Sequence, residues 1–278
     1  MSHISVPSSD VAVRAPQTQV AKAIADIRES VLNARFWLSL AWIDIVQRYR
    51  GSMLGPFWLT LSTGAFIAGL GPIYSQLFGA DLRTYLPYLA LGLLVWNFIA
   101  ASVNESCRSF IDFGSVMKQI RMPLSTQLLH VVTRNVIVFL HCIPLYALII
   151  LVFQLPLSWS MLLALPGFAL LCLNLVNVGL ILAIICVRFR DFIQVTASVM
   201  QIAFFVTPIM WRPDQRPILG LISDLNPLAS LIALVRNPLM NEPLTAVQLG
   251  WGLGGFVLTS ALAFFLFVRY RQRIIYWV

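Results

Sequence analysis

Three histidines and four cysteines are the residues best suited to bind a metal or act as nucleophiles, and neither set has the spacing of a site. His3, His130 and His141 form no His-Glu-x-x-His or comparable metal-ligand pattern. The cysteines lie in or beside apolar runs, without redox or metal-ligand spacing: Cys107, Cys142, Cys172 and Cys186. The sequence also lacks a Gly-x-x-x-x-Gly-Lys-Ser/Thr phosphate loop and a serine nucleophile elbow. We therefore expect no catalytic residue, no metal and no cofactor bound by this chain.

One polar stripe lies inside an apolar segment. His130, Arg134 and His141 are spaced by four and then seven residues, which places them on one face of a helix. Two interpretations stay open. Either the basic side chains reach the inner interface of a membrane, or they form a vestibule that attracts a diphosphate headgroup.

The elements that carry these residues belong to a membrane protein. Of 278 residues, 59% are hydrophobic and 11% charged, and the mean hydropathy is +0.83. A soluble domain is about 45–50% apolar and about 25% charged, so the composition excludes a soluble enzyme, a nucleic-acid-binding domain and a disordered protein. A net charge of +8 in so apolar a chain favours an anionic membrane surface as its partner.

Six apolar segments approach or exceed the roughly 20 residues that a helix needs to cross a bilayer. They are residues 56–78, 85–103, 124–153, 161–187, 192–211 and 247–268. If the first leaves the cytoplasm, the inner segments hold 15 of the 19 Lys and Arg residues and the outer segments hold 4. The positive-inside rule then predicts an all-α, six-span protein with both termini in the cytoplasm.

Two segments outside the spans have patterns of their own. Residues 1–20 read as a flexible cytoplasmic tail, and the apolar residues of 21–50 recur at steps of three, four or seven, typical of an amphipathic interface helix. Residues 51–278 would form the transmembrane domain. Within it, residues 212–242 are too apolar for a solvated loop and are broken at Asn226-Pro227, which predicts two short helices that re-enter the outer side.

Carboxylates are nearly absent from the six segments, whereas an ion-coupled transporter normally keeps ionisable groups near the midplane. Energy would therefore come from a partner. Aromatic residues make up 12% of the chain, either as an interfacial belt or as a pore wall that stacks on sugar rings. The candidate pore-lining residues are Trp58, Tyr74, Trp96, Phe204, Phe205, His130 and Arg134.

Four ordered motifs resemble one family. They are residues 48–58, with the sequence RYRGSMLGPFW; residues 115–123; residues 188–191 followed by Gln201 and 205–209; and residues 226–228 with 236–239. Together they resemble the membrane subunits of type-2 ABC exporters that move polysaccharides, the O-antigen, capsule and teichoic-acid permeases. Gln119 departs from the family, in which a second basic residue is common at that position.

The resemblance implies a homodimer in the bacterial inner membrane, driven by two copies of a separate ATPase that holds ATP and Mg. It would move a polyprenyl-diphosphate-linked glycan through a pore between the two copies. The family pattern nominates Arg48, Arg50, Lys118, Arg121, Arg188, Arg190 and Asp191 for ATPase coupling or headgroup contact. It nominates Asn226, Pro227 and Arg236 for an outer gate.

Three alternatives remain open. A type-2 ABC permease for a drug or lipid would share the topology and the partner. A membrane-embedded glycosyl- or acyltransferase would need a carboxylate or histidine cluster that the sequence does not offer. A structural scaffold would bind and stimulate no ATPase.

Overall fold

The computed structural model describes residues 18–53, 55, 57–119 and 122–278, and these residues form helices and no strand. The α-helices are α1 (Gln19–Leu32), α2 (Ala34–Arg48), α3 (Phe57–Leu77), α4 (Leu82–Asp112), α5 (Gly114–Gln119), α6 (Thr126–Phe153), α7 (Ala164–Arg188), α8 (Phe192–Val206), α9 (Pro217–Leu225), α10 (Pro227–Leu239) and α11 (Ala246–Trp277). Two short 3₁₀ helices are η1 (Trp159–Leu163) and η2 (Pro213–Gln215).

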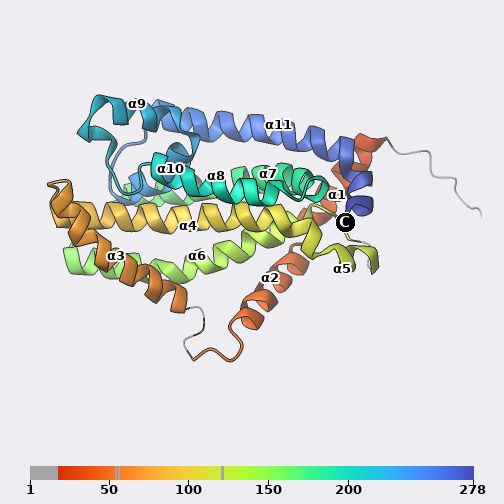
Figure 1. The fold of residues 1–278 in the computed structure, drawn as a ribbon, viewed down its shortest axis with the longest axis horizontal. Coiled ribbons are helices and arrows are strands. Elements are labelled where there is room, and N and C mark those ends of the chain that lie inside the picture. Colours follow the sequence, from red (N-terminus) through yellow and green to blue (C-terminus); the bar gives the residue numbers. More distant parts are fainter. Residues whose placement is uncertain (1–17, 54, 56, 120–121) are drawn as a thin grey trace, which may run out of the picture.

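The long helices share one axis, and the chain runs back and forth between the two ends of the bundle (Figure 1). Four of them, in α4, α6, α7 and α11, are long and apolar enough to cross a membrane, and the bent pair α9–α10 raises the number to five at most. This confirms an all-helical, multi-pass membrane protein. The other two predicted spans are α3 and α8, and α8 has only 15 residues, so a total of six spans stays a prediction.

α4 is the centre of the bundle. In its most apolar window 83% of the residues are buried, compared with 17% in α6 and in α11. α4 packs against α3, α6, α7 and α8. The few residues of α4 that remain accessible therefore lie where the neighbouring helices leave an opening.

The segment 21–50 forms two helices instead of one continuous interface helix. Asn33 separates α1 from α2, and its backbone N–H closes α1 by donating to the Glu29 carbonyl. Asparagine readily adopts such non-helical conformations. The Trp37 indole donates to the Ser30 carbonyl at 3.0 Å, so a carbonyl near the break keeps a partner. α1 lies beside α11, whereas α2 packs against α6 and its C-terminal end points away from the bundle (Figure 1).

The segment after α8 contains the two short helices that the sequence predicts. α9 and α10 meet at Asn226 and are bent by 97°. The Asn226 side chain caps α10, because its Oδ1 accepts hydrogen bonds from the backbone N–H groups of Leu228 and Ala229 at 2.9 and 3.4 Å. Re-entry of this pair into a membrane stays a prediction.

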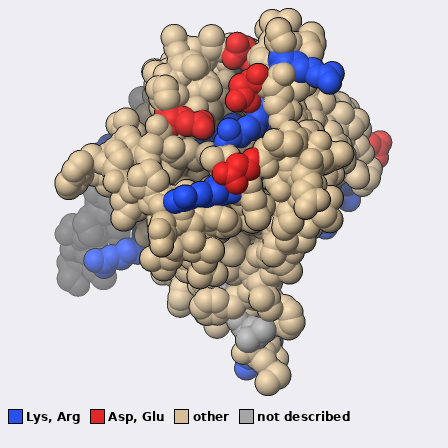
Figure 2. Space-filling view, turned by 90° about the vertical axis from the view of Figure 1, so that its left-hand side faces the viewer, with Lys and Arg blue, Asp and Glu red and all other residues tan. Residues whose placement is uncertain are grey.

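The end of the bundle that holds the α3–α4 turn and α9 carries acidic and basic side chains close together (Figure 2). The segments predicted to lie outside hold four acidic residues, Asp81, Asp214, Asp224 and Glu242, against four arginines. The excess positive charge of the chain therefore belongs to the segments that meet at the opposite end, near α1 and α5. We call these the outer and inner ends.

Candidate functional site: an uncharged path between two polar clusters

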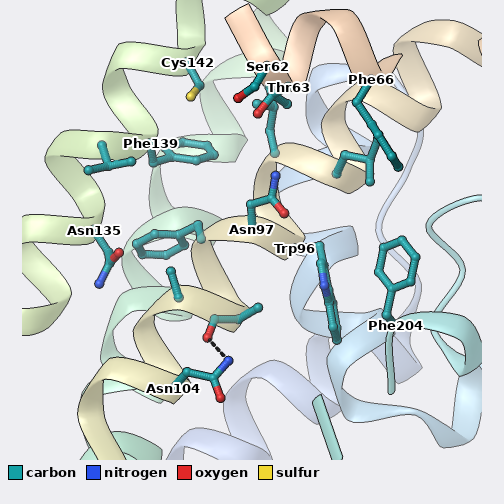
Figure 3. Close-up of a pocket in the computed structure, with 16 residues that line it drawn as sticks. Ser62, Thr63, Phe66, Trp96, Asn97, Asn104, Asn135, Phe139, Cys142 and Phe204 are labelled. Atoms are coloured by element: carbon teal, nitrogen blue, oxygen red, sulfur yellow. Dashed lines mark hydrogen bonds between the residues drawn. The ribbon is translucent and has the colours of Figure 1, made fainter. Parts of the chain in front are cut away.

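A pocket of about 600 Å³ opens between α3, α4, α6 and α8. Among the described residues its lining carries no charged side chain. Its polar groups are Ser62, Thr63, Asn97, Asn104 and Asn135, and its aromatic rings are Phe66, Trp96, Phe98, Phe139 and Phe204 (Figure 3). Amides and aromatic faces are therefore the chemistry that this pocket offers.

Two of the three asparagines come from the side of α4 that its neighbours leave open. Asn97 and Asn104 are two helical turns apart, so they lie on one face of the helix. Asn97 is exposed and points toward α3, and the Asn104 amide donates to the Ala100 carbonyl at 2.8 Å (Figure 3). These amides keep further donor and acceptor capacity for a ligand.

A second pocket, of about 380 Å³, continues from the first toward α8. The two share Trp96, Ala100, Asn104 and Phe204, and the second adds Gln201 and Phe205. The rings of Trp96 and Phe204 lie 5.7 Å apart between centroids and 56° from coplanar, a normal distance for an aromatic pair. The shared residues make the two pockets one continuous surface without charge among the residues described.

A cluster of ion pairs lies where α2, α4 and α6 meet near the inner end. Arg134 donates to Asp44 of α2 at 2.7 Å and to Glu105 of α4 at 2.8 Å. The Asn135 amide donates to Glu105 at 2.6 Å, and Nε2 of the fully buried His130 lies 2.9 Å from an Asp44 oxygen. We call this the Arg134 cluster.

A second inner cluster ties α1 to α6 and α11. The buried Asp26 carboxylate accepts from the backbone N–H groups of Leu124 and Ser125, both at 3.1 Å, where α6 begins. It also accepts from Nε and Nη2 of Arg271 on α11, at 3.0 and 2.8 Å. An anion at a helix N-terminus is favourable, so one carboxylate both caps α6 and neutralises Arg271. We call this the Asp26 cluster.

The outer end is held through backbone carbonyls of the turn after α8. The Tyr85 hydroxyl donates to the Met210 carbonyl at 2.6 Å, and the Tyr88 hydroxyl lies within reach of the Pro208 and Trp211 carbonyls at 2.9 and 3.1 Å. The buried Arg236 of α10 donates to the Pro208 carbonyl at 2.6 Å, with its guanidinium carbon 4.0 Å from the Tyr88 ring centroid. We call this group the outer cap.

The predicted gate residues belong to this outer cap or adjoin it. The Asn226 amide donates to the Thr207 hydroxyl at 3.0 Å, which links the α9–α10 bend to the turn after α8. Pro227 is the first residue of α10. The structure thus brings Asn226, Pro227 and Arg236 into one region.

The predicted coupling residues do not form a single patch. Lys118 Nζ donates to the Val278 carbonyl at 3.2 Å, and the Arg188 guanidinium lies 5.5 Å from the Trp277 ring centroid, so both adjoin the end of α11. Arg190 and Asp191 are exposed beside Arg188. Arg48 is the last residue of α2, and its Nη2 lies 3.4 Å from a carboxylate oxygen of Glu105, so it adjoins the Arg134 cluster. Arg50 follows α2 and is exposed. Arg121 lies outside the described residues.

The seven candidate pore residues divide into three groups. Trp96, Phe204 and Phe205 line the uncharged surface. Trp58 is exposed on α3, and Tyr74 packs 5.8 Å from Phe78 between ring centroids. His130 and Arg134 direct their polar atoms at Asp44 and Glu105, so within this chain they are part of an ion cluster and do not form an open basic wall.

Sequence reasoning missed the carboxylates that hold the inner end. Asp26 and Asp44 fall within the predicted interface helix at 21–50, and Glu105 falls just past the predicted span at 85–103. A signal existed for two of them: an arginine inside an apolar segment needs an anionic partner, and Arg134 pairs with both Asp44 and Glu105.

Comparison with known proteins gives three relatives of one kind. An O-antigen export system permease protein, RfbA of Klebsiella pneumoniae, is 27% identical over 232 residues, covering 82% of this chain and 90% of that protein. A second Klebsiella pneumoniae RfbA is 28% identical over the same shares. The RfbA of Myxococcus xanthus is 26% identical over 214 residues, covering 74% of this chain and 80% of that protein.

The family pattern described as ABC-2 type transporter matches residues 35–240. That range takes in nearly all of α2 and continues through α10, so it includes the uncharged surface, the Arg134 cluster and the outer cap. A match over so much of the chain assigns the family: this protein belongs to the ABC-2 type transporters.

Proposed function

We propose that this chain is the transmembrane subunit of an ATP-driven exporter that moves a lipid-linked, O-antigen-like polysaccharide across the bacterial inner membrane. The membership of the ABC-2 type transporter family and the three O-antigen export permeases among its relatives support this proposal. The single observation that carries it is the uncharged surface of amides and aromatic rings along α4 and α8.

The chemistry of that surface suits a sugar polymer. The amides of Asn97, Asn104 and Gln201 can each donate to and accept from hydroxyl groups. The faces of Trp96 and Phe204 can pack on the C–H faces of sugar rings. Among the described residues no charged side chain lines the surface. A neutral polymer would therefore make many weak contacts and no strong one, and it could slide along the surface.

A second copy of the chain would complete the path. Helix α8 leaves a row of large apolar side chains exposed, among them Val199, Ile202 and Phe205, with exposed fractions of 55%, 65% and 68%. This row adjoins the second pocket. A homodimer that covers the row would enclose the uncharged surface between its two subunits.

The remaining parts of the proposal concern topology and energy. Residues 51–278 would make six passes with both termini in the cytoplasm, and residues 212–242 would re-enter from the outer side as the gate formed by Asn226, Pro227 and Arg236. Two copies of a separate ATPase would bind ATP and Mg, since this sequence has no phosphate loop. The residues that would contact the ATPase or the diphosphate headgroup are Arg48, Arg50, Lys118, Arg121, Arg188, Arg190 and Asp191.

Loss of the gene tests this proposal. We expect lipid-linked glycan to accumulate inside the cell and surface glycan to disappear, with return of both to normal when the gene is supplied. Trp96→Leu and Asn104→Leu should restore export poorly, because each removes a contact for sugar rings. The matched control is Leu165→Ala on α7, an apolar residue 69% exposed and outside both pockets.

Two further results separate this function from its alternatives. Normal surface glycan in the deletion strain would contradict polysaccharide export and would favour a permease for a drug or lipid. Arg48→Ala with Arg50→Ala should lower export at unchanged membrane insertion. Normal export in that double variant would exclude a headgroup role for the two arginines.

A further inference from the structure

A third pocket lies away from the proposed path, between the inner ends of α7 and α11. Its volume is about 490 Å³. Two arginines line it, Arg188 at the end of α7 and Arg273 on α11, together with the aromatic residues Tyr270 and Trp277. α11 packs along α7 and α10, on the side of the bundle opposite α3 and α6 (Figure 1).

The two arginines hold no anion from the protein. Both are exposed, and within the described part of the chain neither takes part in an ion pair. The Arg188 guanidinium carbon lies 5.6 Å from the Phe189 ring centroid and 5.5 Å from that of Trp277. Such stacking orients a guanidinium but leaves its N–H groups available for an anion.

Two other arginines near the same end are bound by carboxylates. Arg134 binds two carboxylates, and Arg271, two residues before Arg273, binds Asp26. Among the described residues Arg188 and Arg273 lack such a carboxylate, as Arg190 and Arg269 do, but only Arg188 and Arg273 of these four line the pocket. A phosphate is the group that two guanidinium forks bind well.

The pocket is apolar at its other end. Ile184 lies one helical turn before Arg188, and Leu266 lies seven residues, or about 10 Å, before Arg273, both toward the middle of the bundle. Tyr270 stands between Leu266 and Arg273 along α11. From the middle of the bundle outward, the pocket thus offers apolar side chains, then aromatic side chains, then two cations. A phospholipid of the inner leaflet presents its acyl chain, its glycerol backbone and its phosphate in the same order.

We propose that this pocket binds an anionic phospholipid of the membrane, with the phosphate between Arg188 and Arg273 and an acyl chain along Ile184 and Leu266. The inference rests on the proposed orientation, which puts the inner end at the cytoplasmic leaflet. A bound lipid would brace the turn between α7 and α8 against α11. Helix α8 lines the uncharged surface. The lipid, bound outside the proposed path, would therefore help to hold α8 in position.

Retained lipid is the direct test. The full-length protein is placed in nanodiscs of phosphatidylcholine with a minor fraction of phosphatidylglycerol, and the phosphatidylglycerol that stays with the protein on release is counted by native mass spectrometry. The test variant is Arg188→Gln with Arg273→Gln. The matched control is Arg269→Gln, which removes an exposed arginine of α11, one turn from Arg273, that does not line the pocket.

We expect the double variant to retain phosphatidylglycerol at least about tenfold less well than the wild type, as the loss of two arginines at a membrane surface implies. Arg269→Gln should retain it normally, and Arg188→Lys with Arg273→Lys should recover much of the loss. Size-exclusion profiles and helical circular dichroism establish that each variant is folded.

Three outcomes would overturn the inference. The first is equal retention in the double variant and in Arg269→Gln. The second is equal retention of phosphatidylcholine and phosphatidylglycerol by the wild type, which would mean apolar contact alone. The third is displacement of phosphatidylglycerol by an equimolar polyprenyl phosphate, which would assign the pocket to the transported lipid. None of these measurements depends on export, so the proposed function stands or falls separately.

Discussion

The two ends of the bundle are held together by different kinds of contact. At the inner end, charged side chains join helices far apart in sequence, as Asp26 of α1 does with Arg271 of α11. At the outer end, hydroxyl and guanidinium donors bind backbone carbonyls of the non-helical turn after α8. One end therefore fixes helices to one another, and the other end fixes the chain where it stops being helical.

The difference follows from what each end must satisfy. Buried carbonyls that are freed from a helix need donors from elsewhere in the protein, and Tyr85, Tyr88 and Arg236 supply them. At the inner end most contacts join side chains of different helices, and such ion pairs can separate and re-form when a helix shifts. We expect the outer cap to be rigid and the inner clusters to be the joints at which an ATPase could move α1 and α2.

Asp26→Asn should cause the largest loss of stability. It removes the charge that neutralises Arg271 and weakens the cap on α6, and loss of one partner from a buried pair costs about 3 kcal/mol. Thermal unfolding in detergent should show a midpoint markedly lower than that of the wild type. Glu29→Gln, on the same helix but exposed, is the control and should unfold like the wild type. An unchanged midpoint for Asp26→Asn would mean that α1 is not anchored through this carboxylate.

Arg236→Gln should cause the next largest loss of stability, and it tests the outer cap. The substitution removes the contact to the Pro208 carbonyl and the charge over the Tyr88 ring, and the loss of one charged hydrogen bond costs about 2 kcal/mol. Arg216→Gln, an exposed arginine at the same end, is the control. A loss of export at unchanged stability would instead make Arg236 a gate residue without a structural role.

Asp44→Asn should lower the free energy of unfolding by less, because Arg134 keeps Glu105 as a partner. We expect a loss of about 1.5 kcal/mol, in the range of one hydrogen bond to a charged group. The sharper signature is local: amide hydrogen exchange should speed up in α2 and stay unchanged in α10. Equally faster amide exchange in α2 and α10 would contradict the view that the inner end is movable and the outer end rigid.

Much of the fold could be predicted because its signals are local. Apolar runs predicted α4, α6, α7 and α11, and the Asn226-Pro227 dipeptide predicted the bend between α9 and α10. The clusters could not be found in this way, since nothing near Asp26 in the sequence indicates that its partners are Leu124 and Arg271. The same limit applies to the uncharged surface, which depends on which face of α4 its neighbours leave open.

The smallest effect we expect is that of Tyr88→Phe, about 1 kcal/mol for a neutral hydroxyl. The Pro208 carbonyl keeps Arg236 as a donor, so only the Trp211 carbonyl loses a partner. Tyr276→Phe, 87% exposed on α11, is the control and should be neutral. The double variant Tyr88→Phe with Arg236→Gln should lose more than the two single losses added together, because it leaves the Pro208 carbonyl without either donor. Simple additivity would mean that the donors act independently and that the outer cap is not one rigid unit.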